Sequence, residues 1–211
     1  MCAIIGFTSK TLTADEVRPY FDRTVSRGPD ATRLEAVGSA SCLGFHRLAI
    51  MGLHEEGMQP FYLGGDAAVC NGELYGFRPV KKALEAKGYT FRSDSDCEII
   101  LPLWKEYGVE MFAKLDAEFA MVIYDAASDS LVAARDPIGI RPLFYGYLAD
   151  GGIVFASEAK NLIGLCKEVC PFPPGHYYKD GKFVDFDIQE ALNMKKDIPE
   201  EQYEVSKLLV R

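Results

Sequence analysis

The chain begins Met1-Cys2-Ala3-Ile4-Ile5-Gly6-Phe7, a cysteine followed by a short apolar run. The continuous apolar residues from Ala3 to Phe7 are typical of a β-strand that is covered on both faces. Position alone favours a buried structural role for Cys2, since free cysteine is among the most buried residue types. The alternative is that removal of Met1 makes Cys2 the first residue. Its α-amine, with a reference pKa of about 7.7–8.0, would then be a base placed next to its own thiol.

The composition is that of an ordinary globular protein, and it lacks the excess of positive charge that would bind large anionic partners. The 211 residues are 48% hydrophobic and carry a formal charge of −8, which argues against nucleic acid or an anionic membrane as a partner. The N-terminus lacks the basic stretch and long apolar core of a signal peptide, and no segment approaches the length of a membrane span. We therefore expect a cytoplasmic protein that acts on a small, polar or neutral substrate.

The six cysteines are scattered along the chain without a CxxC pair. In a reducing compartment this pattern predicts free thiols. Cys166, Cys170 and His176 lie close in sequence, but their spacing does not match a zinc site. We expect no metal site.

Short β-type runs and a few helical patterns come in blocks, without a steady βαβα alternation. Helices are predicted after Thr13, where Thr13 and Glu16 suit a capping box, over about Pro79–Lys87, and from about Asp96 to Tyr107. Gly88 and Gly108 are the expected stop signals of the second and third helices. The block order favours an α+β sandwich over a doubly wound nucleotide-binding fold. The predicted strands cover Ala3–Phe7, Cys42–Ile50, Ala67–Cys70, Phe119–Tyr124, Leu131–Ala134, Leu143–Tyr147 and Ile153–Ala156.

Asn71-Gly72 closes an apolar run with a side-chain amide and an unhindered backbone N–H. These two groups are suited to donate hydrogen bonds to a developing oxyanion. Asn-Gly is also the strongest short signal for a β-hairpin turn. The residues alone leave the two interpretations evenly balanced.

Three charged residues are candidates for binding an amino acid at both of its charges. Arg47 follows a strand-like run, and a guanidinium grips a carboxylate with two hydrogen bonds. Glu73 and Asp96 offer acceptors for an α-ammonium group. The alternatives are a surface ion pair for Arg47, a solvated loop acid for Glu73 and a helix N-terminal carboxylate for Asp96.

Four segments, together with the N-terminal cysteine, carry a family resemblance. The chain resembles the class II glutamine amidotransferases, and within them the glutaminase domain of glutamine-hydrolysing asparagine synthetases. The resemblance covers about residues 2 to 180, and its strength lies in the joint order of the segments. The four segments are Ser26–Asp30, Phe45–Ile50, Asn71–Tyr75 and Ser93–Glu98, and the likeness continues through Ala134–Leu143, Phe155–Lys160 and Phe172–Gly175.

The resemblance implies the four-layer αββα sandwich of the N-terminal-nucleophile hydrolases. It also implies that glutamine is hydrolysed to glutamate and ammonia through a thioester on Cys2. In the family, residues matching Asn71 and Gly72 form the oxyanion hole, the match to Arg47 binds the α-carboxylate, and the matches to Glu73 and Asp96 bind the α-amine. The turn Arg27-Gly28-Pro29-Asp30, which an Arg–Asp pair would brace, is expected to be structural or interface-forming.

The resemblance also predicts the domain organisation. We expect a glutaminase domain over residues 2–180 and, over 181–211, the start of a linker or next domain, with the ATP-pyrophosphatase synthetase domain absent. ATP and Mg²⁺ would serve only that absent domain, and the glutaminase part would need no cofactor. The absent domain, or an equivalent partner, would accept the ammonia. The oligomeric state stays open, with a homodimer as one option. Two alternatives remain: an amidotransferase domain for another acceptor, of the β-lactam or sugar type, and a catalytically silent glutamine-binding module.

Overall fold

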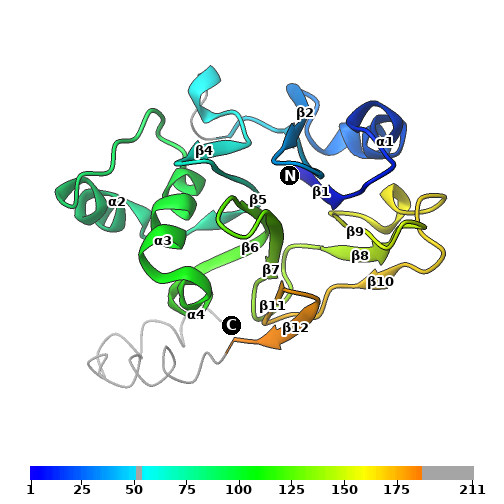
Figure 1. Cartoon of the computed structure of the whole chain (residues 1–211). Coiled ribbons are helices and arrows are strands. Elements are labelled where there is room, and N and C mark those ends of the chain that lie inside the picture. Colours follow the sequence, from blue (N-terminus) through cyan, green and yellow to red (C-terminus); the bar gives the residue numbers. More distant parts are fainter. Residues whose placement is uncertain (51–53, 187–211) are drawn as a thin grey trace, which may run out of the picture.

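The computed structural model describes residues 1–50 and 54–186. They form two stacked antiparallel sheets with helices on the outer faces (Figure 1). Each sheet has six strands. The α+β class predicted by the block order and the four-layer αββα sandwich implied by the family resemblance are both confirmed.

The first sheet contains the N-terminal strand near its centre. Its order is β10 (Cys170–Pro171), β8 (Phe144–Tyr147), β9 (Ile153–Ala156), β1 (Ala3–Thr8), β3 (Ser41–Arg47) and β2 (Ala31–Val37). Strand β1 pairs with β3 over its whole length, so that Ala3 lies opposite His46 and Thr8 opposite Ser41. The residue after Cys2 is thus fixed beside the end of β3.

The second sheet carries the Asn71-Gly72 pair. Its order is β12 (Lys182–Asp185), β11 (His176–Lys179), β7 (Ser130–Arg135), β6 (Ala117–Asp125), β5 (Asp66–Leu74) and β4 (Phe61–Leu63). Strand β12 follows residue 180, the predicted end of the domain, and pairs with β11 in the same sheet. The predicted linker from residue 187 onward lies outside the described residues.

Strand β1 is covered on both faces, as its continuous apolar run predicts. Ile4 faces the core between the sheets, together with Val69 and Val122 of the second sheet. Ile5 and Phe7 face the outer core beneath the first helix. Gly6 permits close approach of the sheets, because a Cβ there would lie 2.7 Å from Val122 Cγ1.

One helix covers the outer face of the first sheet. Helix α1 (Ala14–Phe21) begins with the predicted capping box of Thr13 and Glu16 and continues into the 3₁₀ helix η1 (Asp22–Arg27). Its Val17 and Phe21 pack against strands β1 and β9. Near the same face, the short 3₁₀ helix η5 spans Ala159–Asn161.

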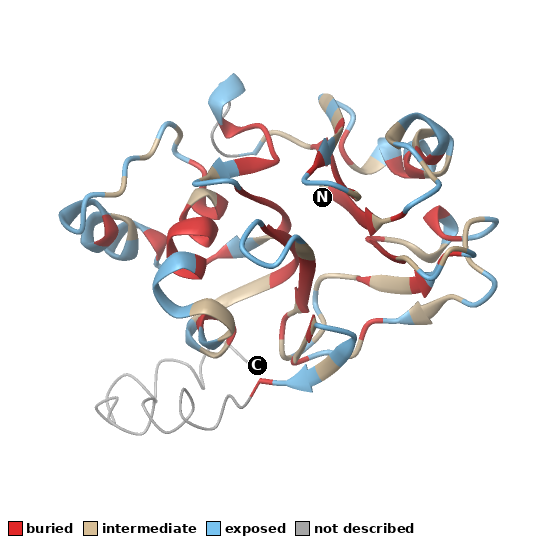
Figure 2. Ribbon diagram, in the orientation of Figure 1, coloured by how far each residue is buried: buried red, intermediate tan, exposed pale blue. Residues whose placement is uncertain are grey.

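The other helices cover the outer face of the second sheet. They are α2 (Phe77–Ala86), α3 (Ile100–Tyr107) with its leading 3₁₀ helix η3 (Asp96–Ile99), and α4 (Met111–Lys114) after η4 (Gly108–Glu110). The chain leaves α2 through Gly88 at φ +99° and α3 through Gly108 at φ +53°, as the glycine stop signals predict. Figure 2 shows the buried residues on the facing strands and on the sheet-facing sides of these helices.

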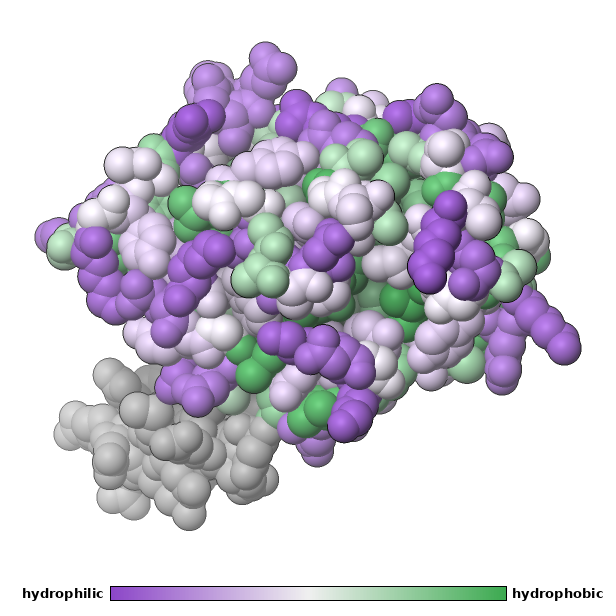
Figure 3. All heavy atoms as spheres, viewed as in Figure 1, coloured by the Kyte–Doolittle hydropathy of each residue, from purple (hydrophilic) through white to green (hydrophobic). Residues whose placement is uncertain are grey.

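The exposed surface fits this layered core. On the face seen in Figure 3, apolar residues are scattered among hydrophilic ones. Among the described residues, no helix is both long and apolar enough to cross a membrane.

Candidate active site

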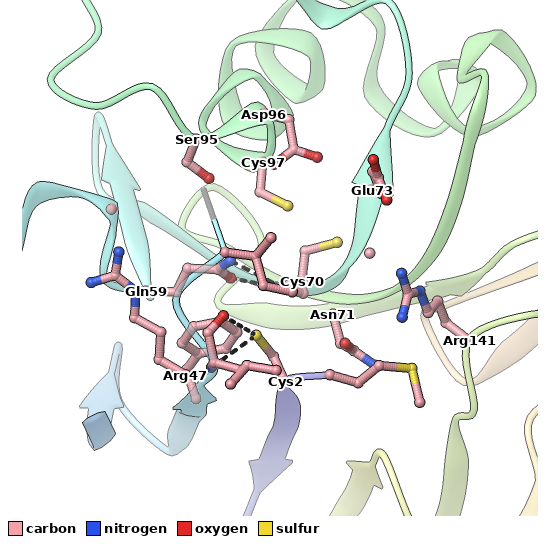
Figure 4. A pocket seen from close by; sticks show the side chains of 16 residues that line it. Cys2, Arg47, Gln59, Cys70, Asn71, Glu73, Ser95, Asp96, Cys97 and Arg141 are labelled. Carbon is pink, nitrogen blue, oxygen red and sulfur yellow. Dashed lines mark hydrogen bonds between the residues drawn. The ribbon is translucent and has the colours of Figure 1, made fainter. Parts of the chain in front are cut away.

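A pocket of about 160 Å³ opens where the N-terminus, the end of β3, strand β5 and helix η3 meet (Figure 4). All the residues singled out as site candidates from sequence line it, although they come from four separate parts of the chain. They are Cys2, Arg47, Asn71, Gly72, Glu73 and Asp96. The fold thus brings a nucleophile, two amide donors and three charged side chains around one cavity.

The Cys2 thiol is held by the backbone just beyond the end of β3. Its Sγ accepts a hydrogen bond from the Leu48 N–H at 3.3 Å and donates to the Leu48 carbonyl at 3.6 Å. Burial raises the pKa of the Cys2 thiol, while the Leu48 N–H and the positive charges of the Met1 α-amine and Arg47 act in the opposite direction. A neutral thiol in this position needs a base before it can attack.

Arg27 fixes the backbone of Cys2 and is itself held by an ion pair. Arg27 Nε donates to the Cys2 carbonyl oxygen at 3.0 Å, and its Nη1 pairs with Glu158 at 3.0 Å. The predicted Arg27–Asp30 pair is therefore wrong: Asp30 instead accepts the Ala49 N–H at 2.7 Å. This geometry ties the Arg27–Asp30 turn to the nucleophile and to the segment after β3.

Asn71 and Gly72 lie inside strand β5, where they face Ala120 and Phe119 of β6. The hairpin-turn interpretation is wrong, and so is the placement of the pair at a strand end, because β5 continues to Leu74. The hydrogen-bonded pairing of β5 with β6, and the contact of Leu74 with Asp96 of η3, outweigh the local turn preference of Asn-Gly. The Asn71 side chain is directed into the pocket from a rigid strand.

The Asn71 amide is a buried donor with no partner. The residue is 2% exposed, and its Nδ2 is buried without a hydrogen-bond acceptor in the described part of the chain. An unsatisfied buried donor costs free energy, so native proteins rarely keep one without a function. Its position beside Cys2 in the pocket suits a donor that makes its hydrogen bond only while a ligand is bound.

Arg47 is the last residue of β3 and is buried, which contradicts the surface ion-pair alternative. Its Nη1 donates to the His54 carbonyl oxygen at 3.0 Å. Figure 4 shows its guanidinium on one side of the pocket and Glu73 on the other. A buried guanidinium at the pocket wall provides the positive charge that a substrate carboxylate needs.

Asp96 and Glu73 supply negative charge on adjoining elements. Asp96 is the first residue of η3, and its Oδ2 accepts the Leu74 N–H of β5 at 2.7 Å. The expected position of Asp96 at a helix start is confirmed, but its carboxylate accepts a hydrogen bond from strand β5 and not from the helix. Glu73 is exposed at the pocket and lies opposite Glu118 across the sheet, whose carboxylate pairs with Arg141.

Several pocket residues have no assigned role in the sequence interpretation: Gln59, Cys70, Ser95, Cys97 and Arg141. Arg141 lies in the Ala134–Leu143 segment, so the motif contained it without indicating its contact. Gln59 precedes Pro60 between apolar residues, and no short-range pattern marks it. Contacts between distant segments, which single-sequence periodicity does not report, place these side chains in the pocket.

The described residues contain no group of three His, Cys, Asp or Glu side chains arranged to hold a metal ion. All six cysteines are free.

Comparison with known proteins gives the family. Residues 1–177 match the family model described as a glutamine amidotransferase domain. The chain is 39% identical over 196 residues to a probable glutamine-hydrolysing asparagine synthetase of Dictyostelium discoideum, covering 88% of this chain and 35% of that protein. It is 42% identical over 156 residues to a probable enzyme of the same name from Schizosaccharomyces pombe, covering 72% and 28%. The chain thus spans about a third of the length of these relatives.

The fold comparison agrees. The structure is similar to glutamine phosphoribosylpyrophosphate amidotransferase from B. subtilis, with a TM-score of 0.71 and 20% identity, covering 89% of this chain and 50% of that one. It is also similar to a class-II glutamine aminotransferase domain protein from Silicibacter pomeroyi, with a TM-score of 0.52 and 16% identity, covering 88% and 98%. With the family model matching most of the chain, this protein belongs to the glutamine amidotransferase domain family.

Proposed function

We propose that this chain hydrolyses L-glutamine to glutamate and ammonia, with the Cys2 thiol as nucleophile. The observation that carries the proposal is the unpartnered, buried Asn71 Nδ2 in the same pocket as the Cys2 thiol. A thiol and a waiting amide donor are what acyl transfer at a carboxamide requires. A module that only binds glutamine would have no use for either group in this placement.

In the first half of the reaction, Met1 has been removed and the α-amine of Cys2 takes the thiol proton. The thiolate attacks the carboxamide carbon, and the carbonyl oxygen becomes an oxyanion that Asn71 Nδ2 and the Gly72 N–H stabilise. The protonated amine then gives its proton to the departing nitrogen, and ammonia leaves. A γ-glutamyl thioester on Cys2 remains.

In the second half, the same α-amine takes a proton from water as the water attacks the thioester. The oxyanion forms again at the same two donors and collapses with loss of the thiolate. The thiolate recovers a proton through the amine, and glutamate is released. The raised pKa of the buried thiol supports the need for this adjacent base.

Substrate selection follows from the charges around the pocket. Arg47 binds the α-carboxylate, while Glu73 and Asp96 bind the α-ammonium. Analogues that lack either charge would leave buried or partly buried groups unpaired, and such sites discriminate strongly. This assignment is supported by the burial of Arg47 and Asp96 in the pocket wall.

We further propose that the ammonia serves asparagine formation from aspartate and ATP in a longer protein. The support is that the curated relatives carry the name asparagine synthetase and extend well beyond the matched region. Residues 2–180 would be the glutaminase domain, and ATP and Mg²⁺ would belong to the synthetase region that receives the ammonia. A cytoplasmic location completes the proposal and is supported by the six free cysteines.

Ammonia release from glutamine tests the proposed function. The purified chain with its natural continuation should form glutamate and ammonia in equal amounts, and Cys2→Ala should form neither while still binding glutamine. Turnover that persists in Cys2→Ala would refute the nucleophile. Binding of glutamine without turnover by the unaltered protein would favour the silent binding module.

A further inference from the structure

The side chain of Gln59 forms a two-point link to the backbone next to the oxyanion donors. Its Nε2 donates to the Cys70 carbonyl oxygen at 3.1 Å, and its Oε1 accepts the Cys70 N–H at 2.6 Å. Gln59 is 4% exposed and lines the pocket. The amide of one side chain therefore satisfies both polar groups of the residue before Asn71.

The register of the sheet explains this position. Strand β4 pairs with β5 so that Leu63 faces Asp66 and Phe61 faces Ala68. Continuing the register by two residues places Gln59 opposite Cys70. Here the side chain of Gln59, and not its backbone, makes the hydrogen bonds that would continue the β4–β5 pairing. The segment before Gln59 turns away from β5 into the 3₁₀ helix η2 (Glu55–Gly57).

This arrangement decides where the Gly72 N–H points. In an antiparallel strand, the backbone groups of alternate residues point to the same neighbouring strand. The groups of Cys70 point toward the β4 side, since Gln59 binds both of them. The N–H of Gly72 therefore points to the same side, where β4 has ended and the pocket begins.

We propose that Gln59 is a positioning residue that fixes the oxyanion donors by holding Cys70; this inference rests on the proposed glutaminase function. With Gln59 in place, the edge of β5 is clamped one residue before Asn71, and the Gly72 N–H stays in line with the Asn71 amide. Only a side chain that both donates and accepts fills this role, and glutamine is one of few that do. Its effect is on transition-state stabilisation and leaves the groups that bind the charges of glutamine in place.

The first test is the near-isosteric Gln59→Met, which removes both hydrogen bonds. We expect kcat for glutamine hydrolysis to fall about 10- to 100-fold, the size of effect that small misplacements of catalytic groups produce. The KM for glutamine should change by less than about threefold, because the interaction lost is one made in the transition state.

Asp66→Asn is the matched control. Asp66 lies in the same strand, and its Oδ1 accepts the backbone N–H of Ala126 at 3.0 Å, but it does not line the pocket. This variant should lower the melting temperature while its kcat stays within about twofold of the unaltered protein. A comparable loss of kcat in both variants would mean that any weakening of β5 has the same effect, and would overturn the positioning role.

A second variant, Gln59→Glu, gives a readout that stability alone does not move. When protonated, the introduced carboxyl can donate to the Cys70 carbonyl and accept from its N–H; when ionised, it repels the carbonyl. The kcat of the variant relative to the unaltered protein, at saturating glutamine, should therefore rise as the pH is lowered. A ratio that does not change with pH would contradict the inference. This test holds even if Gln59→Met fails to fold.

The outcomes separate the two proposals. Normal turnover in the unaltered protein with an unchanged kcat in Gln59→Met overturns the role of Gln59 alone. Absence of turnover in the unaltered protein, with its natural continuation, overturns the proposed glutaminase function itself.

Discussion

Arg27 holds the backbone of Cys2, since its Nε donates to the Cys2 carbonyl oxygen at 3.0 Å while its Nη1 pairs with Glu158. The Arg27 guanidinium is charged, so its hydrogen bond to the Cys2 carbonyl oxygen is stronger than one between neutral groups. The contact joins the end of η1, the start of β1 and the segment after β9. It fixes the direction in which the Cys2 residue leaves β1.

We predict that Arg27→Met slows the reaction of Cys2 by about tenfold, because an unrestrained nucleophile spends less time in the attacking geometry. The measurement is the rate of Cys2 labelling by a glutamine-like electrophile such as diazo-oxo-norleucine. Labelling by iodoacetamide, which needs no bound orientation, should change much less.

Arg23→Met is the control for this prediction. Arg23 lies in the same 3₁₀ helix and donates to the carbonyl oxygens of Lys160 and Ile163 at 2.6 and 2.7 Å, away from the pocket. Its labelling rate should match that of the unaltered protein. Equal slowing in both variants would show that general loosening of η1 is responsible.

A methyl group at Gly72 should damage both the fold and the reaction. A Cβ there would lie 2.6 Å from the Glu118 carbonyl oxygen, a backbone atom that cannot move alone. Gly72→Ala should cost about 1–3 kcal/mol of unfolding free energy. Its melting temperature should fall by roughly 2–4 °C per kcal/mol. Its kcat should fall well below that expected from the unfolded fraction alone, and a normal kcat in the folded variant would contradict the role of the Gly72 N–H.

Asp96→Asn tests the charge of the amine-binding group without removing its contact to β5. The asparagine oxygen can still accept the Leu74 N–H, so the stability should be nearly unchanged. The KM for glutamine should rise by about 10- to 100-fold through loss of a charge-assisted bond, with a smaller effect on kcat. An unchanged KM would show that Asp96 serves only to join η3 to β5.

His46 should make the stability of the fold depend on pH. Its ring is fully buried and stacks on Phe21 with centroids 3.7 Å apart, and burial lowers the pKa of His46 below its ordinary value of 6.5. The unfolded chain therefore binds a proton at a higher pH than the folded one. The unfolding free energy should decrease as the pH falls from about 6.5 toward the lowered pKa, and should level off below it.

Urea unfolding between pH 7.5 and 5 checks this dependence. His46→Gln should flatten the slope in that window, whereas His176→Gln, at a half-exposed ring in β11, should leave it in place. An unchanged slope in His46→Gln would assign the pH dependence to other groups.

The sequence predicts best those features that local chemistry dictates. The capping box at Thr13, the glycine stops at Gly88 and Gly108 and the two-sided burial of β1 all appear in the structure. Each of them depends on a few consecutive residues. The seven predicted strands are found as well, although the one predicted over Cys42–Ile50 ends at Arg47.

Features set by distant contacts are not visible in the sequence. Strands β4, β10 and β12 lie at sheet edges and are short, and β12 has only two apolar residues between a charged residue at each end, so their apolar signal is weak. Asn71-Gly72 has the local preference of a turn, yet pairing with β6 keeps it extended. Arg27 pairs with Glu158 and not with the nearby Asp30, and Gln59 binds Cys70. Both contacts join segments that only the fold brings together.

The mass of the N-terminal peptide after labelling with diazo-oxo-norleucine tests most directly whether Cys2 is a terminal nucleophile. We predict that the active protein yields a peptide that begins at Cys2, without Met1, and that the label is on the Cys2 thiol. Excess glutamine should protect against it. A label on another cysteine, or full glutaminase activity in protein that retains Met1, would contradict Cys2 as a terminal nucleophile with its own amine as base.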